Sequence, residues 1–242
     1  MITKEKYRIR LKGIIKYTYK KIGRAINDYQ MISCNDRLLI AVSGGIDSLC
    51  LLNLLISRKA RVPIDFNIIA CFIETDFIKV NKEILIEYFK ELKVEYVIKR
   101  LTLKEAQLDC FWCSWNRRKI LFETARDFNC NKVVLGHNMD DIIETTLLNF
   151  FFNGEISTMK PKIELFGGKL IIIRPLCYIE KKDLISLASK FNFPDTQYEC
   201  RYGKNSQRQM VREIIKSVYR VCPSVKKNIF RSLYRIKKDY LL

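Results

Sequence analysis

The sequence has no apolar segment long enough to cross a membrane. Its most apolar stretches, residues 49–56 and 170–173, are far shorter than the about 20 residues that a membrane-spanning helix needs. The first residues, MITKEKYRIRLKG, also lack the apolar core and the small-residue cleavage site of a secretory signal. We therefore expect a cytoplasmic protein with no membrane partner.

Other familiar signatures are missing as well. Neither GxxxxGK[ST], which is typical of P-loop NTPases, nor GxGxxG, which is typical of dinucleotide-binding enzymes, occurs in the chain. The C-x-x-C at residues 110–113 has no second pair, which argues against a zinc ribbon. Nine cysteines without a secretory signal favour metal ligands or core thiols over disulfides. Cys50, Cys71 and Cys177 lie in apolar contexts and are expected in the core.

Acidic residues are scarce at both ends of the chain. Residues 1–24 contain nine basic and one acidic residue, and residues 199–242 contain twelve and three, so the ends hold nearly all of the net charge of +18. This asymmetry predicts that the ends contact a polyanion such as nucleic acid, while the neutral body does something else. The alternative, lysines on solvated helix faces, does not explain why acids are depleted only at the ends.

Short apolar runs alternate with helical segments through the body of the chain. Each run is too apolar for a sheet with one face exposed to solvent. The pattern therefore predicts an α/β fold. Its five-stranded parallel, Rossmann-like sheet would have helices on both faces and basic helical extensions at the two ends. The predicted strands are residues 37–43, 65–74, 94–99, 132–136 and 170–174, and the predicted helices are residues 4–29, 47–58, 82–92, 115–128, 140–152, 181–190, 205–221 and 225–240. The predicted domains are an N-terminal helix (1–30), an α/β body (31–180) and a C-terminal extension (181–242).

The first strand is followed at once by SGGIDS, a pattern suited to phosphate binding. Its two glycines allow a tight turn that brings backbone N–H groups to phosphate oxygens, and its serines add hydroxyl donors. Asp47, an anion beside phosphates, fits this role through a bridging Mg²⁺. An ordinary strand-to-helix turn would explain a bare Gly-Gly pair but not the whole pattern. The candidate nucleotide-binding residues are Ser43, Gly44, Gly45, Asp47 and Ser48.

A second acidic motif, GHNMDD, ends the fourth predicted strand and begins a helix. Two interpretations of Asp140 and Asp141 stay open. They compensate the helix dipole, or they hold Mg²⁺ and orient the reacting oxygen of a bound substrate. His137 is the single histidine of the chain. Together with Gly136 it is a candidate for lining the site, although a lone histidine is more often structural.

Three cysteines are candidate metal ligands. Cys110 and Cys113 have the spacing at which two thiolates reach one metal, and Cys200 lies in a polar segment, YECRYG, where a core thiol is not expected. Three thiolates favour a [4Fe–4S] cluster with one open iron over a tetrahedral zinc. A metal-free or redox-active C-x-x-C pair remains the alternative.

Together these motifs resemble the tRNA 2-thiocytidine synthetase family, within the pyrophosphatase-loop (PP-loop) ATP pyrophosphatase superfamily. The similarity runs from residues 23–26 to residues 206–209 and is most specific over residues 136–162. It implies an adenine nucleotide α-hydrolase-like fold and a [4Fe–4S] cluster held by Cys110, Cys113 and Cys200. One departure is Gly203, where the family often has a further cysteine.

The resemblance also implies a reaction. The expected enzyme is an ATP- and Mg²⁺-dependent tRNA sulfurtransferase that adenylates the 2-oxo group of a pyrimidine, expected to be cytidine 32, and replaces it with sulfur. Asp47, Asp141 and Lys119 are the expected catalytic residues. Lys119 lies in a basic run with Arg117 and Arg118, which either neutralises charge on the adenylate or a tRNA phosphate or is a solvated helix face.

The expected partners are tRNA, a sulfur donor such as a cysteine desulfurase or inorganic sulfide, and a second copy in a homodimer. Three alternatives stay open. Two are related enzymes, a tRNA 2-thiouridine synthetase and a lysidine synthetase, the second of which needs no cluster. The third is a non-catalytic nucleotide- or RNA-binding module, which would leave the candidate cluster cysteines unexplained.

Overall fold

The structure of the protein is a computed structural model. Among the described helices, none is both long enough and apolar enough to cross a membrane. The described residues are 12–76, 78–102, 110–191, 193–196, 199–200 and 207–240.

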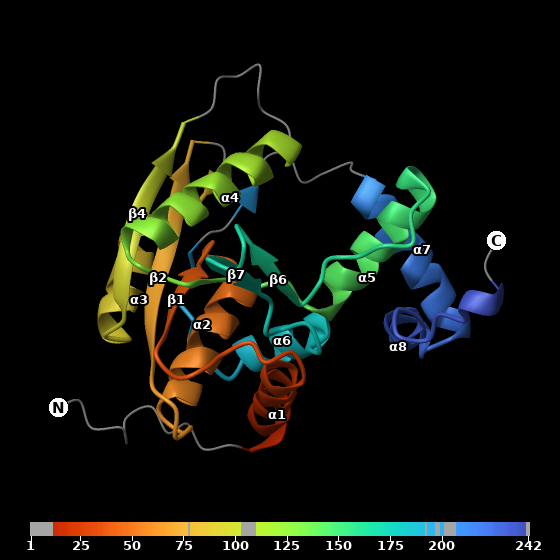
Figure 1. The fold of residues 1–242 in the computed structure, drawn as a ribbon, viewed down its shortest axis with the longest axis horizontal. Coiled ribbons are helices and arrows are strands. Elements are labelled where there is room, and N and C mark those ends of the chain that lie inside the picture. The colour runs from red at the N-terminus through yellow and green to blue at the C-terminus, as the bar shows by residue number, and fades with distance from the viewer. Residues whose placement is uncertain are drawn as a thin grey trace. The chain divides into compact units, whose positions relative to one another are not determined.

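The chain divides into two compact units. The first unit contains Met1–Asn138 and Pro161–Tyr202, and the second contains Met139–Lys160 and Gly203–Leu242. The first unit holds the sheet and the second is helical (Figure 1). These units do not follow the limits of the predicted domains, 31–180 and 181–242, because residues 139–160 group with the C-terminal helices and residues 181–202 group with the sheet.

A mostly parallel sheet forms the centre of the first unit. Its strand order is β6-β7-β5-β1-β2-β3-β8, with β4 paired to β2. The pairs among β7, β5, β1, β2 and β4 are parallel and correspond to the five predicted strands, which confirms the predicted parallel sheet. The strands β3, β6 and β8, which pair antiparallel, were not among the predicted ones. The strands are β1 (Asp36–Ala41), β2 (Phe66–Thr75), β3 (Ile78–Lys79), β4 (Glu95–Leu101), β5 (Lys132–Val134), β6 (Lys162–Leu165), β7 (Leu170–Ile173) and β8 (Glu199–Cys200).

Helices cover the sheet on both faces, as predicted (Figure 1). Helix α4 packs on β1, β4 and β5, above a core that includes Leu39, Ile69 and Val133. Alternate strand residues such as Leu38 point to the opposite face, where α2 contacts β2 and α6 packs against α1 and α2. The helices of this unit are α1 (Gly13–Asp28), α2 (Ile46–Lys59), α3 (Lys82–Glu91), α4 (Cys110–Asp127) and α6 (Lys181–Ala188).

The second unit is built from short helices around a small apolar core. Met139, Ile143, Val211, Ile215 and Val225 form that core. Its elements are α5 (Met139–Leu148), a π-helical turn (Asn149–Asn153), α7 (Gln207–Val221), α8 (Val225–Ser232) and a 3₁₀ helix (Lys238–Tyr240).

Two predicted helices extend beyond the helices that the structure describes. The helix expected over residues 225–240 is wrong beyond Ser232, because Tyr234 and Ile236 are exposed and give the helix no buried apolar face to continue on. The part of the first predicted helix before α1, residues 4–11, lies outside the described residues.

A buried ion pair joins β1 to β5 where both strands begin. The Lys132 Nζ lies 2.6 Å from the Asp36 Oδ2, and the two side chains are 5% and 6% exposed. Lys132 also donates to the Met31 carbonyl, while Asp36 accepts from the Ser33 N–H and the Asn131 amide. These contacts satisfy both charges and fix β1 beside β5, and therefore also fix the loops that follow these strands.

Replacing Lys132 tests this arrangement. Lys132→Met leaves the Asp36 carboxylate buried without its cation, and we expect a loss of about 3–5 kcal/mol of stability. The double variant Asp36→Asn, Lys132→Met removes both charges and should regain much of that loss. Urea unfolding followed by circular dichroism measures both. A single variant as stable as the wild type would contradict a structural role for the pair.

Candidate active site

The SGGIDS segment forms the turn between β1 and α2. Gly44 has a φ of 86°, a left-handed conformation that favours glycine. Gly45 is the N-cap of α2 and provides no side-chain hydrogen bond to the helix. The first turn of α2 is thus free of a side-chain cap, an arrangement suited to binding an anion.

The two serines of this turn bond within it. The Ser48 Oγ accepts from the Ser43 N–H at 3.1 Å and donates to the Gly45 carbonyl at 2.8 Å. The Ser43 Oγ in turn accepts from the Gly45 N–H at 3.3 Å. The hydroxyls therefore hold the shape of the turn, and their predicted role as phosphate donors stays a prediction.

A segment that is distant in sequence, residues 193–196, also contacts the SGGIDS turn. The buried Thr196 donates from Oγ1 to the Gly44 carbonyl at 2.7 Å, and its own carbonyl accepts from the Asn81 N–H. Between this segment and the turn lies a cavity of about 420 Å³. Its lining residues are Ser43, Gly44, Gly45, Ile46, Asp47, Leu49, Lys181, Phe193, Pro194, Asp195 and Thr196.

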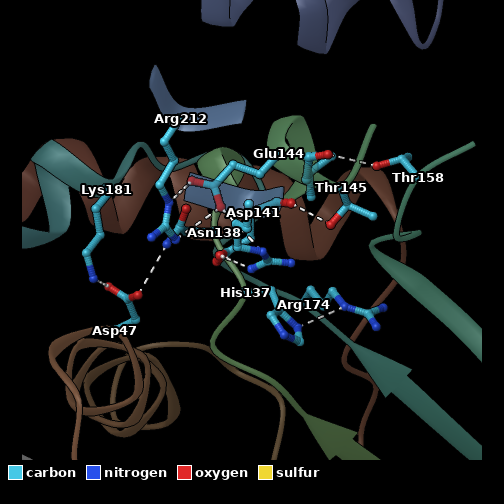
Figure 2. Close-up of polar contacts among 12 residues, drawn as sticks. Asp47, His137, Asn138, Asp141, Glu144, Thr145, Thr158, Arg174, Lys181 and Arg212 are labelled. Carbon is cyan, nitrogen blue, oxygen red and sulfur yellow. Dashed lines mark hydrogen bonds and ion pairs between the residues drawn. The ribbon is translucent and has the colours of Figure 1, made fainter. Parts of the chain in front are cut away.

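Asp47 faces this cavity from the first turn of α2. Its Oδ1 lies 2.7 Å from the Lys181 Nζ, and its Oδ2 accepts from the Asn138 amide at 3.3 Å (Figure 2). The cavity thus presents a carboxylate and an ammonium side by side. A carboxylate oxygen is a ligand that Mg²⁺ prefers, and the ammonium suits a phosphate oxygen, so this donor set fits a magnesium–nucleotide complex.

The carboxyl end of β5 reaches the same turn. A Cβ on Gly136 would lie 3.4 Å from the Ser48 backbone nitrogen, so the missing side chain allows this close approach. Because β5 and β2 lie on opposite sides of β1, the loops after β1 and β5 meet where the strand order reverses. Open α/β sheets bind their ligands at this position.

His137 is oriented by a buried arginine. Its Nδ1 accepts from the Arg174 Nε at 3.2 Å (Figure 2). Burial lowers the pKa of Arg174 to about 10, which still leaves it charged at neutral pH. Because Nδ1 is an acceptor in this bond, the ring proton of a neutral His137 belongs on Nε2, which makes Nε2 a hydrogen-bond donor.

In the second unit, the acids of the GHNMDD motif and the following Glu144 are paired with bases from α7 and α8. Glu144 is buried, and its hydrogen bond to Arg212 raises the pKa of that arginine. The roles predicted for Asp140 and Asp141 at a nucleotide stay predictions. The pairs are Asp140 with Lys226 (2.5 Å), Asp141 with Arg208 (3.6 Å), and Glu144 with Arg212 (2.7 and 3.1 Å).

The candidate cluster cysteines belong to the first unit. Cys110 begins α4, which follows β4, and Cys200 lies in β8, opposite Ile78 of β3. The side chains of Cys110 and Cys200 lie outside the described ones, whereas Cys113 is half-buried against the core beneath α4. Among the side chains that are described, no three His, Cys, Asp or Glu residues are grouped to bind a metal ion.

The three cysteines expected in the core are buried there. The thiols of Cys50, Cys71 and Cys177 are buried, and burial raises the pKa of each to about 12, which confirms them as neutral core thiols.

Lys119 is exposed on α4 and lines a different cavity from the one beside the SGGIDS turn, as does Arg118. Its predicted catalytic role stays a prediction.

Comparison with known proteins identifies the family. A family model described as a PP-loop domain matches residues 16–218. The tRNA-cytidine(32) 2-sulfurtransferase of Ralstonia pickettii (strain 12J) is 36% identical over 230 residues, covering 91% of this chain and 73% of that protein. A second protein of the same name, from Aeromonas hydrophila, is 33% identical, and the match covers 99% of this chain and 82% of that protein. The chain belongs to the PP-loop family.

A solved structure shows the same fold. The U34-tRNA thiolase NcsA from Methanococcus maripaludis, determined with its [4Fe-4S] cluster, superposes with a TM-score of 0.75 at 23% identity. The match covers 92% of this chain and 78% of that one. This PP-loop fold therefore agrees with the one that the sequence resemblance implied.

Several residues beside the SGGIDS turn (residues 43–48, here called the PP-loop) had no local pattern in the sequence that predicted their role, although Arg174 and Lys181 lie within the stretch that the family resemblance covers. Lys181 begins a helix 134 residues after Asp47, and Thr196 is 152 residues from Gly44. Arg174 sits at the end of a predicted strand, where it resembles any residue that terminates an apolar run. Contacts over such separations depend on the fold and have no local pattern.

Two glycines provide a matched test of the PP-loop. Gly44 and Gly168 have φ values of 86° and 85°, so alanine at either position should cost about 1–2 kcal/mol in backbone strain. A Cβ at Gly44 would also lie 3.0 Å from the Val80 Cγ1 and 3.3 Å from the Thr196 Oγ1, while a Cβ at Gly168 has no atom within 4 Å. We expect only Gly44→Ala to weaken ATP binding in calorimetric titration. Equal ATP affinity in the two variants would show that the PP-loop does not bind the nucleotide.

Proposed function

We propose that this chain is an ATP-dependent tRNA sulfurtransferase that adenylates the 2-oxo group of a pyrimidine, cytidine 32, and replaces it with sulfur. The observation that carries the proposal is the Asp47–Lys181 pair on the cavity beside the PP-loop. Relatives at 33% and 36% identity named tRNA-cytidine(32) 2-sulfurtransferase support the choice of substrate over uridine or lysidine chemistry.

Two displacements make up the reaction. In the first, the pyrimidine O2 attacks the α-phosphorus of ATP, an O–P bond forms, and pyrophosphate leaves. In the second, a sulfur nucleophile attacks C2, the C2–O bond breaks, and AMP leaves with the former O2. Activation is needed because an unmodified O2 is a poor leaving group, whereas an adenylate is a good one.

The residues of the cavity suit the first displacement. The Asp47 carboxylate would hold Mg²⁺, and Lys181 would then turn from Asp47 to a phosphate oxygen. The Gly44 N–H would bind the departing pyrophosphate, and the Gly45 N–H would do so on exchanging its bond to the Ser43 Oγ for one to a phosphate oxygen. The Nε2–H of His137 is a donor for an oxygen of the bound substrate, held in that orientation by Arg174. Asp141 is a further proposed catalytic group, whereas Lys119, predicted to be catalytic, lines a different cavity.

Three cysteines fit the donor set of a [4Fe–4S] cluster. Thiolates are the usual ligands of iron–sulfur clusters, and a set of three leaves one iron open to an external ligand. Cys200 lies in β8, which pairs with β3, and β3 in turn pairs with the end of β2. Cys110 begins α4, the helix that follows β4, and β4 also pairs with β2. This backbone topology supports a shared site. When bound, the cluster would supply a soft metal site for the incoming sulfur.

Basic residues of the second unit fall into two groups. Arg208, Arg212 and Lys226 pair with acids of α5, so part of the positive charge stabilises the unit itself. The exposed Lys216 and Lys227 are better placed for tRNA phosphates.

The first test of the proposed function uses Asp47→Asn. It should reduce tRNA-dependent pyrophosphate release by roughly 100-fold or more, because the variant loses the charge that holds a cation at the phosphates. Its affinity for tRNA should remain near that of the wild type. Asp183→Asn is a matched control, since Asp183 also lies in the first turn of a helix but does not line the cavity. Normal pyrophosphate release by Asp47→Asn would refute the assignment.

The second test uses Cys200→Ser. Protein purified without oxygen should be brown and contain about four irons per chain, and Cys200→Ser should lose the cluster because an alkoxide is a poor ligand beside soft sulfide. Cys34→Ser and Cys222→Ser should keep it. ATP binding should survive in all three variants. A fully loaded, active Cys200→Ser protein would overturn the three-cysteine site, and activity without iron would favour a lysidine synthetase.

A further inference from the structure

A second, larger cavity lies between α4 and the β6–β7 hairpin of the first unit. Its volume is about 620 Å³, within the range of about 300–1,000 Å³ that is typical of ligand pockets. The hairpin turn, residues 166–169, precedes β7, and β7 runs parallel to β5. The turn therefore lies at the amino edge of the sheet, opposite the edge where the PP-loop follows β1. This cavity is separate from the nucleotide site.

Aromatic side chains form much of its wall. Trp115 on α4 is 48% exposed and Phe166 at the hairpin turn is 64% exposed. Phe122 also lines the cavity, with its ring centroid 6.0 Å from that of Phe166 in an edge-to-face arrangement. Large rings so exposed on the wall of one cavity offer flat apolar surfaces to a planar ligand.

The conformation of Phe166 is unusual as well. Its φ is 54°, in the left-handed region that bulky residues rarely adopt, and Gly167 and Gly168 after it also have positive φ values. A polar or small residue would adopt this turn at lower cost. Backbone strain that keeps an aromatic ring exposed is a feature of binding sites more than of ordinary hairpins.

The cavity is also strongly cationic. Four basic side chains and a single acid, Glu123, line it. Arg126 among the four is paired with Asp127 at 3.2 Å, which leaves a clear excess of positive charge on the wall. The basic residues are Arg118, Lys119, Arg126 and Lys169.

We propose that this cavity binds one unstacked nucleotide of the tRNA. The base would stack against Trp115 and Phe166, and the adjoining phosphates would lie near Lys119 and Lys169. Aromatic platforms combined with cations are the means by which proteins bind single-stranded nucleic acid, and unpaired nucleotides occur in the loops and at the end of a tRNA. The identity of the ligand as tRNA rests on the proposed function.

The site gives the basic run after Cys113 a definite place. Lys119 lines this cavity and does not line the PP-loop cavity, so a tRNA phosphate is its favoured partner over the adenylate. Arg118 also lines this cavity, but it lies near enough to Arg174 to lower the pKa of that residue. A nucleotide held here would position the tRNA while its target base enters the nucleotide site.

Binding of fluorescently labelled, unmodified tRNA to the full-length protein, measured by anisotropy without ATP, tests the proposal. Phe166→Ala and Trp115→Ala should each weaken binding about 5- to 150-fold, the effect of losing one stacked base. Phe166→Tyr, which keeps the ring, should bind as the wild type does. Ile185→Ala is the control, because Ile185 is a similarly exposed apolar residue (51%) of the same unit but lies outside the cavity.

A second measurement addresses charge. Lys169→Ala should lower the slope of log affinity against log salt concentration by about 0.7–0.9, the contribution of one phosphate contact. Wild-type tRNA affinity in both aromatic variants would overturn the proposal, even if the same variants lost binding to a protein sulfur donor. Because no turnover is needed, weakened binding in a protein that releases no pyrophosphate would support the cavity and refute the proposed function.

Discussion

The parallel pairing of β1 with β5 is the constraint on which the candidate site depends. At the start of the strands it is fixed by the buried Asp36–Lys132 pair. At their ends it brings Asn138 to Asp47 and the backbone of Gly136 to the first turn of α2. A slip of one residue in this register would turn every side chain of the strand to the other face and separate these groups.

Charge in this protein serves two purposes that composition cannot separate. In the second unit the buried Glu144 requires Arg212, since a lone buried carboxylate is costly. In the first unit Lys181 neutralises Asp47 at the edge of a cavity. The excess of +18 therefore includes structural cations as well as those available to a polyanion.

Periodicity and motifs predicted much of the fold from the sequence. Four of the five parallel strands, β1, β2, β5 and β7, are largely buried apolar runs, and that burial leaves a strong signal, whereas β4 is mostly half-buried. The hairpin at Gly167–Gly168 has a sequence signal, a Gly-Gly pair between apolar runs, although it was not predicted. The contacts of Lys181, Arg174 and Thr196 had no local signal, because their partners lie far away in sequence. The end of α8 was missed because loss of an apolar face is visible only after packing is known.

The central claim is that this chain thiolates a cytidine of tRNA. The most direct measurement is mass spectrometry of the nucleosides in total tRNA from a strain that lacks the protein, compared with the same strain carrying the intact gene. The account predicts that 2-thiocytidine disappears, that 2-thiouridine stays at its normal level, and that the intact gene restores the former. Unchanged 2-thiocytidine, or a loss confined to 2-thiouridine, would contradict it.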